Sequence, residues 1–135
     1  MGRRELRESI FHLLFMTEFN PSEDMAEQKK LYLEGLENLT NKDQTYIQEK
    51  FEKICEKKEE IDEMLNKTSK GWKTSRMGKV ELTILRLATY EIFFDEDVPE
   101  GVAINEAVEL AKKFGGDDSY SFVNGILGKL VHSHE

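Results

Sequence analysis

Hydrophobic residues recur every three or four positions along almost the whole chain, the spacing of one face of an α-helix. Runs that alternate between apolar and polar residues, as strands require, are absent. The pattern predicts an all-α protein, a compact bundle of about six to seven helices. The expected helices cover residues 3–19, 23–38, 41–66, 79–94, 102–114 and 118–131, and the third is either unbroken or kinked near residues 56–60.

The segment 79–94 differs from the others because its apolar residues point in nearly all directions. A helix that is apolar all round is buried on every side, so we expect this one at the centre. Gly115 is placed to end the helix before it, since glycine often follows the last helical residue. The break near residues 68–75 predicts two helical halves, roughly 1–68 and 72–135, within a single domain.

Several smaller features of the pattern also predict structure. Asn41, followed three residues later by Gln44, fits a capping box at the start of the third helix. Cys55 lies on the same apolar stripe as Phe51 and Ile54, so we expect its thiol in the core. The inward face of the second helix is expected to consist of Met25, Leu31, Tyr32, Leu36 and Leu39.

Composition narrows the class of protein. The 135 residues include 19 Lys or Arg and 27 Asp or Glu, a net charge of −8. This balance excludes a uniformly basic nucleic-acid-binding protein, although it leaves room for a local basic patch. No apolar run approaches the roughly 18 residues of a membrane span, and the N-terminal residues lack the features of a signal peptide. We therefore expect a soluble, cytoplasmic protein.

The positive charge is concentrated in two places. Between residues 67 and 82, five Lys or Arg residues face a single acid, and Trp72 lies among them. Basic residues beside an aromatic ring are typical of single-strand nucleic-acid binding. The other interpretation is that Trp72 fills the join between the two halves. Arg3, Arg4 and Arg7 form the second basic region, at a helix N-terminus, where cations oppose the helix dipole unless an anion such as phosphate binds.

Residues that could support catalysis or bind a metal are sparse. The three histidines are His12, His132 and His134, and Cys55 is the single cysteine. None has an acidic or thiol partner at the spacing of a metal site, and no nucleophile or phosphate-loop motif occurs. We therefore expect no enzyme, no cofactor and no metal.

The C-terminal half carries two longer motifs, VAINEAVELAK at residues 102–112 and FVNG at residues 122–125. With Val98–Pro99, Phe114–Gly115 and the upstream residues Trp72, Arg76 and Tyr90–Glu91, they resemble the signature of the NusB family of bacterial transcription antitermination factors. The resemblance covers the whole chain and is weakest from Pro21 to Asn66. It implies two packed helical subdomains and no catalysis. It also implies binding to boxA RNA of ribosomal RNA transcripts, as a heterodimer with the ribosomal protein NusE, and a complex with RNA polymerase, NusA and NusG.

The resemblance assigns roles to individual residues. RNA contacts fall on three regions: Arg3, Arg4 and Arg7; Lys73, Arg76 and Lys79; and Phe114, Gly115, Asp118 and Phe122. Contacts with NusE fall on Phe15 and Glu81, with Glu18 and Phe19 as neighbours. Glu5 interrupts the arginine cluster, so RNA affinity without NusE is expected to be lower than in richer family members. Some members self-associate through the surface that binds NusE, and an exposed patch of Phe15 and Phe19 would allow a homodimer here.

Two other interpretations compete with an RNA-binding role. The overall acidity allows a helical protein-interaction module that does not bind RNA. A NusB-like domain also occurs in RNA cytosine methyltransferases, but those enzymes need a much longer chain. Within the motifs, Asn105 and Glu106 are expected to bond between helices, and Asn124–Gly125 to permit close helix approach.

Overall fold

The computed structural model describes residues 1–133, and these residues form seven α-helices, one short 3-10 helix and no strand. The all-α prediction is therefore confirmed. The elements are α1 (Arg3–Met16), α2 (Ser22–Glu34), α3 (Asn41–Glu56), α4 (Lys58–Thr68), η1 (Thr74–Arg76), α5 (Lys79–Phe94), α6 (Glu100–Phe114) and α7 (Ser119–Ser133).

The chain divides into two compact units, which meet in the sequence between Cys55 and Glu56. The division differs from the break expected near residues 68–75. It precedes α4 because α4 packs against α5 and α7 and so belongs to the second unit. The kinked alternative for the third expected helix is correct, since α3 ends at Glu56 and α4 begins at Lys58.

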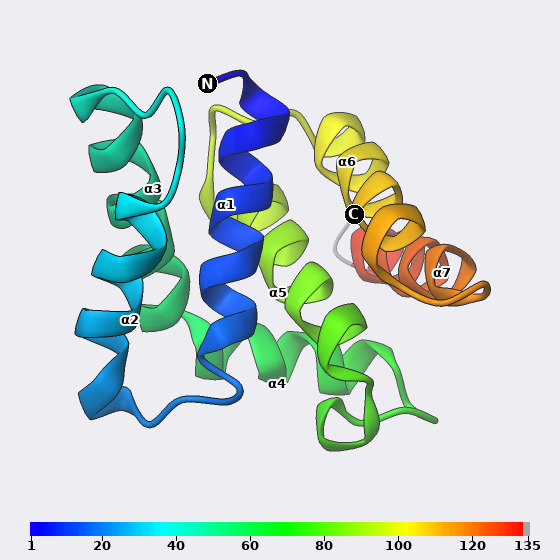
Figure 1. Ribbon diagram of the computed structural model, residues 1–135. Coiled ribbons are helices and arrows are strands. Elements are labelled where there is room, and N and C mark those ends of the chain that lie inside the picture. The colour runs from blue at the N-terminus through cyan, green and yellow to red at the C-terminus, as the bar shows by residue number, and fades with distance from the viewer. Residues whose placement is uncertain (134–135) are drawn as a thin grey trace. The chain divides into compact units, whose positions relative to one another are not determined.

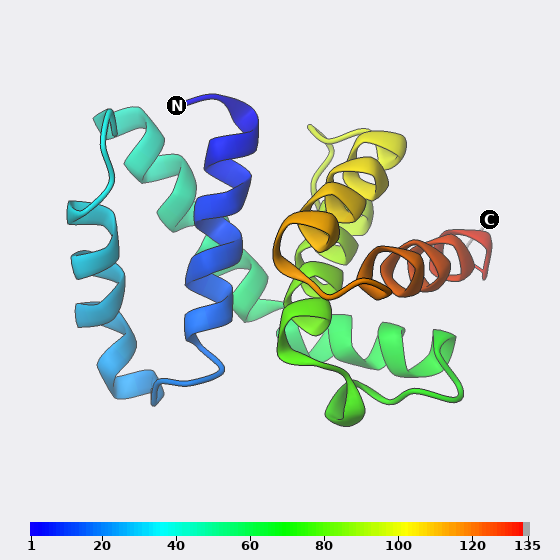
Figure 2. The same ribbon diagram turned by 45° about the vertical axis from the view of Figure 1, so that its right-hand side comes forward.

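The first unit contains α1, α2 and α3, which run alternately down, up and down in the views of Figure 1 and Figure 2. The helix α1 ends at Met16, three residues earlier than expected. The backbone N–H groups of Thr17 and Phe19 bond to carbonyls three residues back, and the Thr17 hydroxyl binds the Leu14 carbonyl at 2.6 Å. These tighter turns stop the α-helix, so Phe19 lies beyond its end.

The predicted inward face of α2 is wrong at its centre. Leu33 is the buried residue of this helix, whereas the Leu31 side chain is 55% exposed. The two leucines stand two positions apart and therefore point to nearly opposite sides of the helix. Leu31, Tyr32 and Leu33 are consecutive apolar residues, so their spacing does not indicate which of them is buried.

Two predictions about α3 also need correction. The capping box is formed one residue earlier than expected, by Thr40 and Asp43: the Asp43 N–H donates to the Thr40 hydroxyl at 3.0 Å, and the Thr40 N–H donates to the Asp43 carboxylate at 3.3 Å. Cys55 is exposed, not buried. It follows the buried Ile54 by one residue, a rotation of about 100° around the helix, which turns the thiol out of the core.

In the second unit α5 runs through the centre and packs against α4, α6 and α7 (Figure 1). Its bounds match the prediction, and every residue from Leu82 to Glu91 is buried. The buried Arg86 of this stretch is paired: it donates to Asp62 of α4 through Nε at 2.8 Å and Nη2 at 2.9 Å. This two-bond geometry fixes α4 against α5.

The helices α6 and α7 complete the second unit and lie against each other. The helix α6 begins at Glu100 after the N-cap Pro99, and it ends with Gly115 at the C-cap, as predicted. Ala103, Ala107 and Ala111 form its buried stripe, so small residues allow α6 to approach its neighbours closely. No helix among residues 1–133 is both long and apolar enough to cross a membrane.

Candidate RNA interface

The first candidate region is the N-terminal end of α1. Arg3 and Arg4 are exposed there, and Arg7 is half-buried one turn later. The N-cap residue is Gly2, which has no side chain to bond the first N–H groups. A helix N-terminus attracts anions, and arginine binds phosphate through two parallel hydrogen bonds. This end of α1 is therefore suited to a phosphate group.

A salt bridge holds the start of the chain in place. The Met1 ammonium group lies 3.0 Å from the Asp43 carboxylate at the first turn of α3. The ammonium lowers the pKa of the Asp43 carboxyl below its ordinary value of 3.8, and the Thr40 N–H adds to this effect. The salt bridge therefore positions the residues just before Arg3 and Arg4 against the start of α3.

The opposite end of α1 carries the residues predicted to contact a partner protein. The Phe15 ring lies 6.1 Å from the buried Phe11 ring and 5.0 Å from the Phe19 ring, the last pair edge to face. Phe15 and Glu18 are half-buried, and the Phe19 side chain is 62% exposed. The first unit thus brings Phe15, Glu18 and Phe19 together. Glu81, the fourth predicted residue, lies in the second unit.

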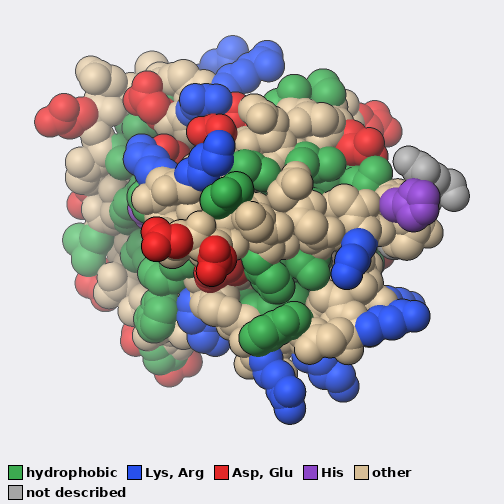
Figure 3. All heavy atoms as spheres, turned by 90° about the vertical axis from the view of Figure 1, so that its right-hand side faces the viewer, with side chains coloured by type: hydrophobic (Ala, Val, Ile, Leu, Met, Phe, Trp, Pro, Cys, Tyr) green, Lys and Arg blue, Asp and Glu red, His purple; other side chains and the backbone are tan. Residues whose placement is uncertain are grey.

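The basic segment of the second unit covers η1 and the residues on each side of it. Lys73 is the N-cap of η1, Arg76 is its last residue and Lys79 begins α5, and all three are exposed. No Asp or Glu occurs between residues 64 and 80. In Figure 3, which faces α6 and α7, Lys and Arg side chains gather at the lower edge, at the height of the segment between α4 and α5. The segment is a positively charged surface on an acidic protein.

An aromatic pocket lies beside this segment. The rings of Trp72 and Phe122 meet edge to face with centroids 6.1 Å apart. Together with Met77, Gly78 and Glu81 they line a cavity of about 160 Å³. The Trp72 side chain is 53% exposed, so the interpretation of Trp72 as a buried filler is wrong. Both rings stay available to a ligand that carries a flat, apolar face.

A chain of hydrogen bonds positions the loop between α6 and α7. The buried Ser119 hydroxyl donates to the Glu81 carboxylate at 2.6 Å and accepts from the Gly116 N–H at 2.9 Å. Gly115 packs so tightly here that a Cβ would lie 2.5 Å from the Ser119 side chain and 2.7 Å from the Ala111 carbonyl oxygen. The loop geometry therefore depends on glycine at position 115 and on the Ser119 hydroxyl.

The remaining predicted RNA-contacting residues lie on this loop and the first turn of α7. The Phe114 ring is half-buried, with the Lys113 ammonium 5.3 Å from its centroid. The Asp118 side chain is exposed, and its carbonyl oxygen accepts the Phe122 N–H at 3.2 Å. Glu81 is the residue that joins this loop to the aromatic pocket, because it lines the pocket and accepts the Ser119 bond.

The sequence comparisons identify the family. A family model described as "NusB family" matches residues 4–132. The chain belongs to the NusB family.

Relatives with assigned names agree with this membership. The chain is 55% identical over 131 residues to the transcription antitermination protein NusB of Lachnoclostridium phytofermentans, covering 97% of this chain and 99% of that protein. It is 50% identical to the NusB protein of Agathobacter rectalis, with 97% and 100% covered.

Solved NusB structures share the fold. The T. maritima NusB structure superposes with a TM-score of 0.88 at 34% identity, covering 98% of this chain and 92% of that one. A crystal structure of the antitermination factors NusB and NusE in complex with dsRNA gives a TM-score of 0.85 at 25% identity, with 97% and 96% covered. The recognition of a NusB fold from the sequence motifs is confirmed.

The sequence analysis did not predict that Ser119 and Gly78 contact Glu81. Gly78 lies so close to Glu81 that a Cβ would fall 2.6 Å from the carboxylate. The contact of Gly78 has one local sign in the sequence, a glycine three residues before an acid at the start of a helix. The contact between Ser119 and Glu81 spans 38 positions and has no local sign. Among residues 1–133, no three His, Cys, Asp or Glu side chains form a group that could hold a metal ion. His132 is exposed, and His134 lies outside the described residues.

Proposed function

We propose that this chain is a transcription antitermination factor that binds boxA-type single-stranded RNA as a heterodimer with NusE. The observation that carries the proposal is the aromatic pocket of Trp72 and Phe122 beside a basic segment without acids. Close relatives that match almost the full chain are antitermination proteins, and the NusB–NusE–RNA complex shares the fold. These findings support RNA and NusE as partners.

In this proposal the RNA contacts divide by chemistry. Arg3, Arg4 and Arg7 and the basic residues Lys73, Arg76 and Lys79 bind phosphate groups, which gives affinity without selectivity. Phe122 stacks on an unpaired base, and the exposed Asp118 carboxylate accepts a hydrogen bond from a base edge. Phe114 and Gly115 shape the loop that presents both residues.

NusE binds at the aromatic end of α1 and at Glu81. The exposed Phe19 ring and the half-buried Phe15 ring offer the apolar contact, and Glu18 offers a charge at its edge. Glu81 receives the Ser119 bond, so NusE contacts a carboxylate that is already held in place. The same apolar surface supports a homodimer when NusE is absent. The heterodimer joins the elongating RNA polymerase with NusA and NusG in the cytoplasm, and the chain has no catalytic role.

The test is fluorescence anisotropy of a labelled boxA-type RNA with this protein, with and without NusE, at two salt concentrations. A scrambled RNA of the same length is the control. We expect selective binding that weakens with salt and strengthens with NusE. Equal binding of both RNAs contradicts the proposal. NusE binding without any RNA binding favours the protein-interaction module instead.

A further inference from the structure

Gly125 has no structural reason to be a glycine. It lies in the middle of α7, where glycine lowers helix stability relative to alanine. Sequence reasoning expected Gly125 to permit close helix approach. That expectation is wrong: the residue is exposed, and a Cβ built on it would meet nothing within 4 Å. The missing side chain therefore leaves space at the surface of the molecule, not between its helices.

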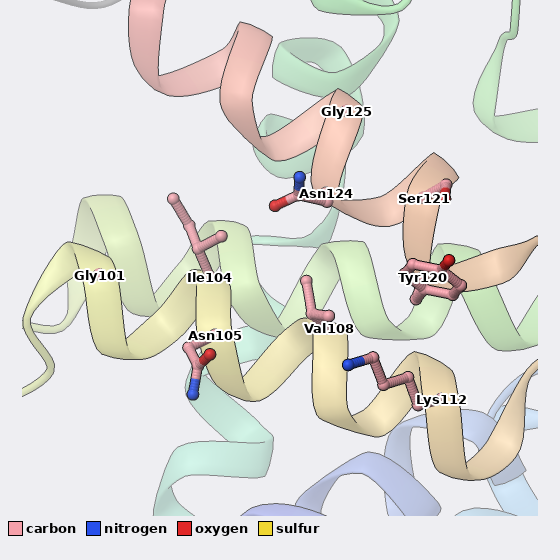
Figure 4. A pocket seen from close by; sticks show the side chains of 9 residues that line it. All are labelled: Gly101, Ile104, Asn105, Val108, Lys112, Tyr120, Ser121, Asn124 and Gly125. Carbon is pink, nitrogen blue, oxygen red and sulfur yellow. The ribbon is translucent and has the colours of Figure 1, made fainter.

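The space belongs to a groove between α6 and α7. The groove has a volume of about 630 Å³, within the range of sites that hold small ligands. In Figure 4, Ile104 and Val108 point from α6 toward α7, and Asn124 points from α7 toward α6. The Lys112 ammonium lies 5.6 Å from the centroid of the Tyr120 ring, and that ring is 43% exposed. The full lining is Gly101, Ile104, Asn105, Val108, Lys112, Tyr120, Ser121, Asn124 and Gly125.

We infer that this groove is a second nucleotide site, which takes a base of the RNA strand that leaves the Phe122 pocket. The inference rests on the proposed function. Phe122 and Gly125 are three residues apart on α7, so their positions are neighbours on the helix surface, roughly 5–6 Å apart. One nucleotide step spans this distance. A strand stacked on Phe122 crosses α7 at Gly125, where the absent Cβ lets it lie close to the helix.

The chemistry of the lining matches a nucleotide. Ile104 and Val108 present an apolar surface to the base face, and Tyr120 offers an aromatic one. The Asn124 amide, which makes no hydrogen bond with other residues of the described chain, can both donate to and accept from a base edge. Lys112 supplies the positive charge for a phosphate, although its ammonium also lies 3.8 Å from the Glu109 carboxylate of the same helix.

Charge favours RNA over a protein as the occupant. No Asp or Glu lines the groove, although the chain as a whole carries a net charge of −8. A strand of phosphates is repelled by most of this surface and is better accepted by a groove whose lining holds Lys112 and no acid, Glu109 being the acid paired with that lysine. Tyr120 and Ser121, which line the groove, lie next to Phe122 in the sequence of α7.

The test uses two glycines of the same helix. Gly128 also lies in α7, is exposed and has nothing within 4 Å of a built Cβ, but it does not line the groove. Gly125→Leu and Gly128→Leu therefore have similar effects on the folded protein, which thermal unfolding verifies. We expect Gly125→Leu to weaken binding of a labelled boxA-type RNA about tenfold, the loss of one base contact, while Gly128→Leu leaves it unchanged.

A crosslinking experiment locates the base independently. RNA carrying 5-iodouracil at successive positions is irradiated with the wild-type protein, and adducts are mapped by mass spectrometry. An adduct at Tyr120 from a position next to the one that crosslinks to Phe122 supports the inference. Equal affinities of the two leucine variants, or adducts confined to Phe122, overturn it and leave the proposed function intact. A Gly125→Leu effect on NusE binding without RNA also overturns it and assigns the groove to protein. Failure of the wild-type protein to bind RNA removes the proposed function itself.

Discussion

Two candidate RNA-contacting regions of this member of the NusB family are built in different ways. At the start of α1 the candidate contacts are long, exposed arginines, and one salt bridge from Met1 to Asp43 anchors the chain before them. At the α6–α7 loop the candidate contacts are few, and buried groups fix the loop around them. Flexible arginine side chains can bind the phosphates of many RNA sequences, whereas a ring held in a fixed position stacks on a base at one place. We infer that the first region supplies affinity and the second supplies selectivity.

The largest expected effect comes from removing the support of the fixed region. Gly115→Ala places a Cβ 2.5 Å from the Ser119 side chain and 2.7 Å from the Ala111 carbonyl oxygen, so the backbone has to move. Such overpacking costs about 1–3 kcal/mol of unfolding free energy. Urea unfolding followed by circular dichroism measures the loss. RNA selectivity should fall with it, because the displaced loop carries Asp118.

Gly116→Ala is the matched control for this prediction. A Cβ at position 116 meets nothing within 4 Å, and the N–H that Ser119 accepts is kept. This variant should be as stable as the wild type or slightly more so. Equal losses of unfolding free energy for the two substitutions mean that tight packing at Gly115 does not determine the conformation of the loop.

The second effect tests the ring itself. Phe122→Ala removes the stacking surface, which is worth about 1–3 kcal/mol of binding free energy per base. Anisotropy titrations with boxA-type and scrambled RNA should show a large loss for the first and a small loss for the second. Phe122→Tyr keeps the ring and should retain selectivity. If Phe122→Ala weakens the binding of both RNAs equally, the fixed region contributes affinity only, and the proposed division of roles fails.

The third effect is smaller and concerns the arginine end. Replacing Arg3 and Arg4 together by alanine should weaken binding to every RNA by a similar factor. The salt dependence should also fall, by up to about 0.7 in log–log slope for each phosphate of a single strand that the variant no longer binds. The Arg3→Lys, Arg4→Lys pair keeps the charge and should preserve most of the slope. If the variant instead changes which RNA sequence is preferred, Arg3 and Arg4 contact bases as well as phosphates.

The two regions also differ in how far the sequence predicted them. The basic residues and the aromatic Phe122 are visible as residue types at recognisable places along the chain. Helix α5 was predicted with its correct bounds because apolar residues on all sides leave a single interpretation, a central buried helix. In α2 the apolar residues at positions 31, 32 and 33 are consecutive and leave several interpretations, and the expected inward Leu31 proved exposed.

Contacts between distant segments could not be predicted. The Ser119 hydroxyl and the Glu81 carboxylate are 38 positions apart, and their bond exists only because α5 and α7 pack together. The open space at Gly125 is likewise a property of the folded surface. From the sequence alone, the expected role of this glycine was close helix packing. Local patterns predict which face of a helix is apolar, whereas the packing of the helices decides which residues contact that face.

The smallest effect concerns the anchor of the arginine end and depends on pH. The pKa of the Asp43 carboxyl is lowered in the folded protein, first by the Met1 ammonium and then by the Thr40 N–H. The ionised carboxylate therefore stabilises the fold above its ordinary pKa of 3.8, and this contribution is lost as the pH falls through the lower folded value. Urea midpoints of the wild type and Asp43→Asn should differ at neutral pH and converge at acidic pH. A constant difference across this range means that the Asn substitution acts through the Thr40 cap and not through the charge. In that case the arginine end has no electrostatic anchor, and its contrast with the fixed loop becomes greater.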